Sequence, residues 1–170
     1  MTYDPQVAKW FNKVDTNRTG ALNAEELQMA LRNNDLTTFD IETVSLMIRM
    51  FDKDNTGTID VNEFCQLWKY LGDWRGSFDR FDRDGGGSID EHELGQALNE
   101  LGYRLSHQFV QEAMRKFDFR RERRLQFDGF VHCLILLQRL TTGFQQFDTQ
   151  RNGNAYFSYE GFLTAVFKHT

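Results

Sequence analysis

The sequence predicts an all-α protein of about eight helices, and two observations lead to this prediction. Five times, two apolar residues three positions apart run directly into an aspartate, at Asp15, Asp52, Asp82, Asp118 and Asp148. The first three of these aspartates open twelve-residue loops with oxygen-bearing side chains at alternate positions, glycine at position six and glutamate at position twelve. This pattern is typical of the Ca²⁺ loop of a helix–loop–helix EF-hand. We therefore expect five EF-hand motifs.

The spacing of the five aspartates indicates how the helices are shared. The intervals between them are 37, 30, 36 and 30 residues. A loop uses about twelve residues and each flanking helix about ten, so the longer intervals leave room for a connecting turn. The 30-residue intervals leave room only for one uninterrupted helix. We expect two long helices, at residues 63–81 and 128–147, shared between hands two and three and between hands four and five.

The connecting turns fall within the longer intervals. Residues 33–38 are a polar, turn-like stretch that ends in Thr38 as the expected N-cap of the next helix. Between loops three and four, Gly102 is expected just beyond a helix end and Ser106 is the expected N-cap. The predicted organisation is a single domain over residues 1–170, with hand one at 5–34, hand two at 40–72, hand three at 73–101, hand four at 106–138 and hand five at 139–170.

Hands one and two, and hands three and four, form natural pairs, which leaves hand five without a partner inside the chain. Short β pairings are expected at position eight of the loops, which is Leu22, Ile59, Ile89, Leu125 and Ala155. An unpaired hand would have unpaired backbone groups and an exposed apolar face. We expect a homodimer through residues 140–170, built by two-fold pairing of hand five with its copy. The alternative is that hand five folds back on its own chain.

Loops one to three have the oxygen ligands that Ca²⁺ requires, which are six to eight hard oxygens with a bidentate carboxylate at position twelve. Gly86 supplies no side-chain oxygen, so a water is expected at that position. Ca²⁺ is the expected ion, with Mg²⁺ as an alternative at rest. The predicted ligands are Asp15, Asn17, Thr19, the Ala21 carbonyl, Asn23 and Glu26 in loop one; Asp52, Asp54, Thr56, the Thr58 carbonyl, Asp60 and Glu63 in loop two; and Asp82, Asp84, the Gly86 position, the Ser88 carbonyl, Asp90 and Glu93 in loop three.

Loops four and five lack the carboxylate at position twelve. In loop four, arginines replace ligands, Arg123 stands at the glycine position and Gly129 stands at position twelve. In loop five, Tyr159 stands at position twelve and Glu160 follows one residue later. We expect no metal in loop four and weak binding at most in loop five.

Composition predicts a folded cytoplasmic protein. The chain has 40% hydrophobic residues, 16 Phe and a single Pro, which argues against disorder. No apolar run is long enough to span a membrane, and the polar start at residues 1–4 lacks a signal sequence. Cys65 and Cys133 are expected to be reduced core thiols.

The charge changes on metal binding in a way that bears on partners. The formal net charge is −5, and three bound Ca²⁺ would bring it to about +1. The basic run at residues 120–124 would then dominate its neighbourhood, either as a contact for anionic lipid or as a solvated loop. The first alternative implies calcium-dependent recruitment to membranes. The chain lacks the net basicity expected for nucleic-acid binding.

Two further groups of residues suggest functions. Trp68 and Trp74, within one long helix, either belong to the core or line a groove for proline-rich extended peptides. Glu91, His92 and His107 are the best material for an active site, but they form no nucleophile–base arrangement, so we do not expect an enzyme.

Several segments give the chain a resemblance to the penta-EF-hand family over essentially its whole length, closest to the programmed cell death protein 6 type. The resemblance implies a cytosolic calcium sensor and dimeric adaptor that binds proline-rich segments of partners in membrane trafficking and repair. It also implies that Trp68, Trp74 and Tyr159 match aromatic pocket residues and that Arg104 matches a residue that shifts when loop three binds metal. The segments are Trp68-Lys69-Tyr70, Asp73-Trp74, Gly102-Tyr103-Arg104-Leu105-Ser106, Leu137-Gln138-Arg139-Leu140-Thr141, Asp148-Thr149 and Ser158-Tyr159-Glu160.

Two other functions remain open at this point. The chain could be a regulatory subunit whose fifth hand pairs with a catalytic chain, as in the calpain small subunit, or a calcium buffer without a partner. A stable homodimer with affinity for peptides would favour the adaptor, whereas a mainly heterodimeric fifth hand would favour the regulatory subunit.

Overall fold

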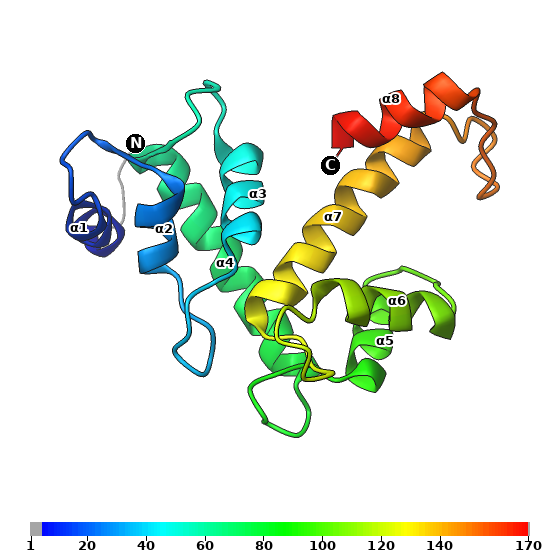
Figure 1. Ribbon diagram of the computed structural model, residues 1–170, viewed down its shortest axis with the longest axis horizontal. Coiled ribbons are helices and arrows are strands. Elements are labelled where there is room, and N and C mark those ends of the chain that lie inside the picture. The colour runs from blue at the N-terminus through cyan, green and yellow to red at the C-terminus, as the bar shows by residue number, and fades with distance from the viewer. Residues whose placement is uncertain (1–4, 170) are drawn as a thin grey trace. The chain divides into compact units, whose positions relative to one another are not determined.

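A computed structural model describes residues 5–169, which form eight helices and two short strands (Figure 1). The all-α prediction is therefore confirmed. Residues 1–4, on which the signal-sequence expectation rested, and residue 170 of hand five lie outside the described part. The elements are α1 (Pro5–Val14), β1 (Ala21–Leu22), α2 (Ala24–Ala30), α3 (Ile41–Phe51), β2 (Ile59–Asp60), α4 (Val61–Phe81), α5 (Glu91–Glu100), α6 (His107–Phe117), α7 (Phe127–Gln145) and α8 (Tyr159–His169).

The chain divides into two compact units, residues 1–131 and residues 132–170. The first unit contains loops one to four, and the second contains the loop and last helix of hand five. The boundary falls inside α7. Among the described residues, no helix has the length and apolar character needed to cross a membrane.

Both long helices are continuous, as the 30-residue intervals predict. Helix α4 runs for 21 residues from Val61 to Phe81, and Gly72 does not interrupt it. Its first turn is fixed by a capping box: the Asp60 side chain accepts from the Glu63 N–H, and the Glu63 side chain accepts from the Asp60 N–H. Helix α7 runs for 19 residues and ends at Gln145, two residues before the predicted end.

The connection between hands one and two differs from the prediction at one point. The N-cap of α3 is Asp40 rather than Thr38, because the Asp40 carboxylate accepts from the N–H groups of Glu42 and Thr43. Phe39, between the two candidates, is buried at 2% exposure. Ser106 caps α6 as predicted, and Gly102 follows α5 with a φ of +91°, a conformation that favours glycine.

The short β pairings form within the two predicted pairs of hands. Leu22 of β1 faces Ile59 of β2 in an antiparallel pair. Ile89 and Leu125 form an antiparallel bridge with reciprocal N–H···O bonds of 2.8 and 2.7 Å. Ala155, at the same position of loop five, lies in no strand of the described chain.

Aromatic side chains form the centre of the first unit. Phe64, Phe78 and Phe130 are fully buried, and the Phe78 ring meets Phe130 edge-on with 5.4 Å between ring centroids. Such edge-to-face pairs add to the free energy gained by burying the rings. This core holds α4 and the start of α7 together beneath loops one to four.

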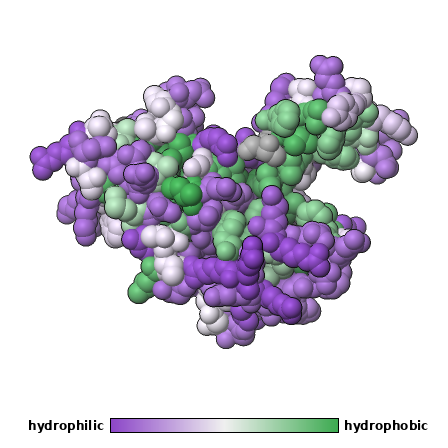
Figure 2. All heavy atoms as spheres, viewed as in Figure 1, coloured by the Kyte–Doolittle hydropathy of each residue, from purple (hydrophilic) through white to green (hydrophobic). Residues whose placement is uncertain are grey.

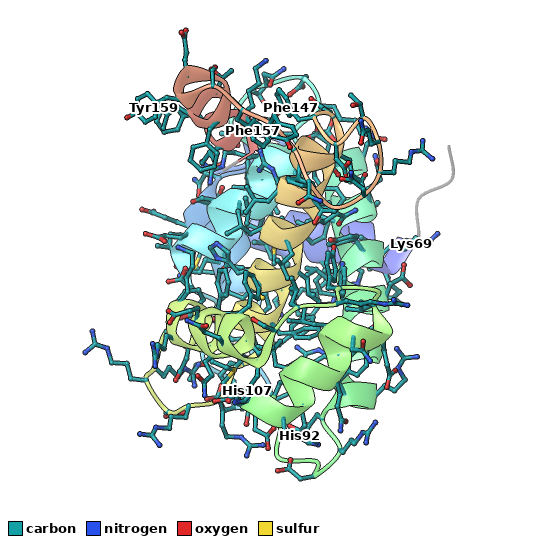
Figure 3. All side chains as sticks on the ribbon, turned by 90° about the vertical axis from the view of Figure 1, so that its right-hand side faces the viewer. Lys69, His92, His107, Phe147, Phe157 and Tyr159 are labelled. Atoms are coloured by element: carbon teal, nitrogen blue, oxygen red, sulfur yellow. The ribbon has the colours of Figure 1, made fainter. Side chains whose placement is uncertain are left out.

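Hand five, in the second unit, has a small aromatic cluster and a wide apolar surface. Phe157 contacts Phe147 at 4.7 Å between centroids, and Figure 3 shows these two rings beside each other, with Tyr159 pointing away from the helix. Figure 2 shows hydrophobic residues gathered over α7 and α8. The large exposed side chains of this unit are Phe144, Phe147, Tyr156, Tyr159, Phe162 and Phe167.

Candidate metal centres

All five loops are organised around the aspartate at position one. Its carboxylate accepts hydrogen bonds from the backbone N–H groups of positions five and six, over donor–acceptor distances of 2.6–3.1 Å. These bonds bend the backbone around the carboxylate, so the remaining side chains and carbonyls of the loop are turned toward its centre. The aspartates are Asp15, Asp52, Asp82, Asp118 and Asp148.

A second carboxylate closes loops one, two and three. The glutamate at position twelve accepts from the N–H groups of positions two and nine, at 2.7–3.2 Å. These are Glu26, Glu63 and Glu93, which are 3–5% exposed. The position-nine residues Asn23, Asp60 and Asp90 also cap the helices that follow. The helix start therefore positions the glutamate opposite the aspartate across each loop.

The donor sets of loops two and three suit a hard divalent cation. Carboxylate oxygens of Asp52, Asp54 and Glu63 lie within 4.8 Å of one another, and so do those of Asp82, Asp84 and Glu93. Loop one has the same hydrogen-bonded frame, with Asn17 in place of the second aspartate. The sets consist of carboxylate, carbonyl and hydroxyl oxygens, as Ca²⁺ prefers. Every metal ligand predicted from the sequence lies in its loop, and the assignment of each as a ligand remains a prediction.

The pKa of the aspartate at position one shifts in opposite directions in loops two and three. Burial and the neighbouring Asp84 together hold the pKa of Asp82 above its usual value, against hydrogen bonds from Gly87 and Gly86. For Asp52, burial raises the pKa, but hydrogen bonds from Gly57 and Thr56 outweigh it, so the net shift is downward. Crowded carboxylates repel one another, and a bound cation relieves this repulsion.

Loop four has the backbone of a metal loop without the ligands. Arg123 stands at position six with a φ of 60°, where loops one, two, three and five have glycine. A non-glycine residue in this region costs roughly 1 kcal/mol. At position twelve, a Cβ on Gly129 would lie 2.3 Å from the carbonyl oxygen of Phe117. A glutamate therefore does not fit there, because α7 lies too close to the end of α6.

Loop five has part of a donor set. Asp148 is buried, and Gly153 has a φ of +80° at the usual glycine position. Tyr159, at position twelve, is 81% exposed, and Glu160 is also exposed. No carboxylate closes this loop from the helix side among the described residues.

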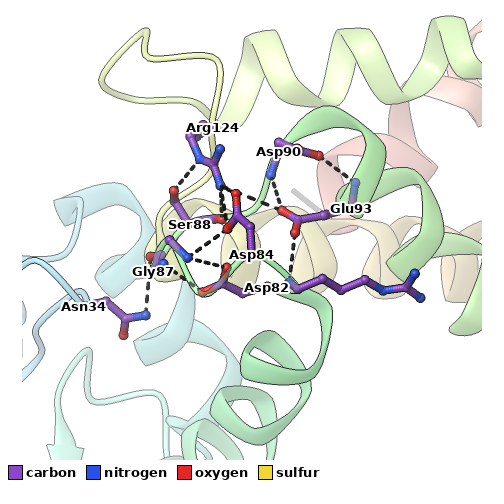
Figure 4. A network of polar contacts seen from close by, with 10 residues as sticks. Asn34, Asp82, Asp84, Gly87, Ser88, Asp90, Glu93 and Arg124 are labelled. Carbon is purple, nitrogen blue, oxygen red and sulfur yellow. Dashed lines mark hydrogen bonds and ion pairs between the residues drawn. The ribbon is translucent and has the colours of Figure 1, made fainter.

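Arg124 of loop four extends into loop three (Figure 4). Its Nε donates to Ser88 Oγ at 2.6 Å, and its Nη2 donates to the Ser88 carbonyl at 3.0 Å. Nη2 also donates to both carboxylate oxygens of Asp84, at 3.2 and 3.0 Å, and lies 4.0 Å from Glu93 Oε2. Three predicted ligand groups of loop three therefore contact one guanidinium.

The connection between hands one and two also contacts loops three and four. Asn34 Nδ2 donates to the Gly87 carbonyl of loop three at 3.3 Å, and the Asn34 side-chain oxygen accepts from Arg75. Arg120 of loop four donates to Asp35, and this contact, followed by the Thr37 hydroxyl, lowers the pKa of Asp35 to about 2. These contacts hold residues 32–38 against the second pair of hands.

An apolar groove lies beside this connection. Its cavity volume is about 390 Å³. Trp10 of α1 and Trp68 of α4 lie side by side on it, with 5.8 Å between ring centroids. The Arg75 guanidinium lies over the Phe127 ring at 3.7 Å. The full lining is Trp10, Ala30, Leu31, Arg32, Phe39, Trp68, Leu71, Gly72, Arg75 and Phe127.

The four residues proposed for peptide binding do not all line this groove. Trp74 instead packs against Tyr70 and Phe130, because six helical residues place it about 120° around α4 from Trp68. Arg104 is exposed on the connection between α5 and α6. Tyr159 belongs to the second unit and is described with hand five. Their role in peptide binding remains a prediction.

The two cysteines and the residues considered for an active site form no further site among the described residues. Cys65 and Cys133 form no disulfide, and burial raises the pKa of the Cys133 thiol to about 12. His107 lies 3.3 Å from Glu91 on the surface of hands three and four, and Figure 3 marks it and His92. Sequence reasoning missed Trp10, Asn34 and Arg75, which belong to no recognisable motif. The basic run at residues 120–124 was a signal for Arg124, but its target in loop three could not be inferred.

Comparisons with known proteins agree with this geometry. A family model for the EF-hand domain pair matches residues 6–69 and 73–134. Peflin from Danio rerio is 42% identical over 164 residues, covering 96% of this chain and 61% of that protein. Sorcin from Schistosoma japonicum is 46% identical over 157 residues, covering 92% of this chain and 91% of that protein.

A solved structure is also similar. It is described as a homolog of programmed cell death 6 protein from Leishmania major Friedlin, and it matches with a TM-score of 0.82 and 32% identity, covering 96% of this chain and 94% of that one. The chain spans about three fifths of the length of the peflins that it matches.

Proposed function

The chain belongs to the penta-EF-hand family of calcium-binding proteins, near the programmed cell death protein 6 type, and we propose that it is a calcium-gated adaptor that binds proline-rich segments of partner proteins. The observation that carries this proposal is the groove between Trp10 and Trp68. A proline-rich peptide in a polyproline II conformation presents rings and a rigid backbone to aromatic-lined grooves, with little entropy to lose. Trp10 is 45% exposed, which leaves apolar area for such a ligand.

The proposed gate is metal binding in loop three. Arg75 lines the groove and donates to Asn34, which donates in turn to the Gly87 carbonyl of loop three. A change of loop three on binding Ca²⁺ would therefore reach a groove residue through two side chains. Ca²⁺ can act as a gate only if the two groove conformations differ in their affinity for the ion.

The test is calorimetric titration of the full chain with a synthetic peptide rich in Pro and Tyr, in excess Ca²⁺ and in excess chelator. Binding is expected only with Ca²⁺. Trp10→Ala should weaken peptide binding by about 2 kcal/mol, the loss typical of an aromatic hot spot. Glu93→Gln should disable site three, so this variant should not bind the peptide with or without Ca²⁺.

The matched control is Phe109→Ala. Phe109 is exposed to a degree similar to Trp10, at 38%, but lies on α6 and does not line the groove. The Phe109→Ala variant should bind the peptide with the same affinity as the unmodified chain. Equal weakening by the Phe109 and Trp10 substitutions would contradict the groove assignment, and binding in chelator would contradict calcium gating.

A second part of the proposal is a homodimer through residues 140–170. Phe167 is 76% exposed and Tyr159 81% exposed, and Ala155 has no strand partner in the described chain. A second copy of hand five would cover these groups and supply the missing pairing. Two copies of the groove would then allow the adaptor to join two partners.

Sedimentation equilibrium tests the dimer directly. The mass should be twice the 20.0 kDa of the chain, and Phe167→Glu should reduce it to that of one chain, while Phe109→Glu on α6 should not. A monomer that pairs only with a different polypeptide would favour the regulatory-subunit function instead. A monomer that binds Ca²⁺ but neither peptide nor protein would be a buffer.

We place this activity in the cytoplasm, with recruitment to anionic membranes when Ca²⁺ is bound. The basic run offers limited surface for that contact, because Arg120 is engaged with Asp35 and Arg124 with loop three. Arg121 and Arg123 are exposed. Cosedimentation with phosphatidylserine vesicles should therefore be weak and sensitive to salt.

A further inference from the structure

We propose that Arg124 is a built-in competitor for the metal of loop three, and that it lowers the Ca²⁺ affinity of this site below what its carboxylates alone would give. The inference rests on the calcium-binding part of the proposed function and is independent of peptide binding. It assigns a regulatory role to loop four, which has no metal-binding role of its own.

The guanidinium lies where a cation is needed. Positions three, seven and twelve of an EF-hand loop each supply oxygen to the ion, and in loop three these are Asp84, the Ser88 carbonyl and Glu93. Arg124 Nη2 donates to the first two at 3.0–3.2 Å and lies 4.0 Å from Glu93 Oε2. Figure 4 shows these contacts converging on one guanidinium. Ca²⁺ needs the same oxygens, so the ion and the guanidinium compete for them as two cations beside the same carboxylates.

The Arg124 side chain is held in one position by burial and by hydrogen bonds. The Arg124 side chain is 32% exposed, and its Nε is fixed by a 2.6 Å bond to the hydroxyl of buried Ser88. Hydrogen bonds from a guanidinium to a carboxylate are among the stronger polar contacts in proteins. The metal-free loop is therefore partly neutralised from within the protein.

Among the described residues, sites one and two have no such competitor. In the described part of the chain, no ion pair joins an arginine or lysine to a predicted ligand of either loop. Loops one and two are joined through Leu22 and Ile59, and loops three and four through Ile89 and Leu125. In the first pair of hands, each metal loop therefore has another metal loop across the β pairing. In the second pair, loop three instead faces loop four, which supplies the competing Arg124.

The consequence is a difference in calcium threshold. Whatever stabilises the metal-free state lowers apparent metal affinity by the same free energy. Loop three has three clustered carboxylates and would otherwise be a strong site, but it must release Arg124 before it binds the ion. Site three therefore responds at higher Ca²⁺ than its ligand set implies.

The test isolates site three in the full chain. Glu26→Gln and Glu63→Gln disable sites one and two, and the single glutamine oxygen still accepts from one side of each loop, from position two or from position nine. Calorimetric Ca²⁺ titration then compares this background with and without Arg124→Gln. Loss of the Arg124 hydrogen bonds to Asp84 and Ser88 from the metal-free state should tighten binding by about tenfold, because solvent screens the exposed Asp84 carboxylate and limits their contribution.

The matched control is Arg121→Gln in the same background. Arg121 is an exposed arginine of the same loop, three residues before Arg124, and no ion pair joins it to loop three in the described chain. Arg121→Gln removes the same charge as Arg124→Gln but leaves the Arg124 contacts with loop three in place. Its Ca²⁺ affinity at site three should therefore tighten by no more than about twofold, because solvent and salt screen an exposed charge. Equal tightening by both substitutions would overturn the inference, as would unchanged or weaker binding in Arg124→Gln.

Thermal unfolding separates competition from a general structural role. Arg124→Gln should lower the Tm of the metal-free chain by about 2–4 °C and leave the Ca²⁺-saturated Tm unchanged. An equal loss in both states would mean that Arg124 supports the fold in either state and would overturn the inference. Absence of binding at site three in both proteins would overturn it together with the assignment of loop three as a metal site. Failure to bind peptide would affect only the adaptor proposal.

Discussion

Gly129 lies so close to Phe117 that a Cβ on the glycine would be 2.3 Å from the phenylalanine carbonyl oxygen. The contact joins the third residue of α7 to the last residue of α6. It replaces the glutamate clamp of loops one to three with direct packing of backbone against backbone. Loop four is therefore closed by backbone packing at the position where loops one to three have a glutamate.

This contact predicts that Gly129→Ala is destabilising. The added Cβ cannot be accommodated without moving α7, and such overpacking costs about 1–3 kcal/mol. Urea unfolding of the metal-free chain measures the change. Gly76→Ala is the control, because its Cβ would meet no described atom within 4 Å in the middle of α4. That substitution should stabilise by up to about 1 kcal/mol, and a similar loss at both positions would contradict the proposed clash.

The glutamate clamp predicts three calcium sites per chain, of unequal affinity. Glu63→Gln should leave two, because loop two loses its bidentate ligand, whereas Glu160→Gln should leave three. Native mass spectrometry counts the ions. Removal of Ca²⁺ by a chelator should lower the Tm, since an ion at about 100 times its Kd adds about 2.7 kcal/mol. A strong fourth or fifth ion would show that loop four or five binds metal without the clamp.

The Arg120–Asp35 contact predicts a pH dependence at acid pH. The pKa of Asp35 is lowered from 3.8 to about 2 in the folded chain, so its contribution to stability is present above pH 4 and is lost as the pH falls toward 2. The difference in unfolding free energy between the unmodified chain and Asp35→Asn should shrink over this range. Urea unfolding at several pH values measures it. In an Arg120→Gln background the same difference should be smaller but not zero, because Thr37 still donates to Asp35. An undiminished difference would contradict the contribution of Arg120.

The aromatic cluster of hand five predicts a local loss of order in Phe157→Ala. The Phe157 ring is half-buried and contacts Phe144, Phe147 and Phe162, with centroids 4.7–6.4 Å away. We expect a loss of about 1–2 kcal/mol, below the 3–5 kcal/mol typical of a fully buried phenylalanine. Hydrogen exchange of the α8 amides should speed up. Tyr156→Ala, at a side chain that is 97% exposed, should leave exchange unchanged, and a matching effect there would argue against the cluster.

The helices and loops could be predicted from the sequence because their signals are local. The interval between Asp52 and Asp82 alone indicates that α4 is continuous, and the position-eight residues identify the β pairings. The N-cap of α3 was misplaced because Thr38 and Asp40 are both good capping residues. The folded chain adds a contact that the local sequence does not show, since the N–H of Asp40 donates to Asp128, 88 residues away.

The polar contacts between hands could not be predicted, because they join residues far apart in sequence. Asn34 and Gly87 are 53 residues apart, and Arg124 and Asp84 are 40 apart. Sequence shows that an arginine is present but not which carboxylate it reaches. Trp10 was missed for the same reason, since its partner Trp68 is brought to it only by the packing of α1 against α4.

The continuity of α4 has a consequence for insertions and deletions. Its 21 residues join loop two directly to loop three, so the two loops are held in a fixed rotational phase. One residue added at Gly72 would turn everything beyond it by 100° and advance it by 1.5 Å, which would move Arg75 off Asn34 and Phe127 off Phe39. An insertion of seven residues, close to two full turns, would nearly restore the phase but would move loop three about 10 Å along the axis. The length of this helix is therefore as constrained as its composition.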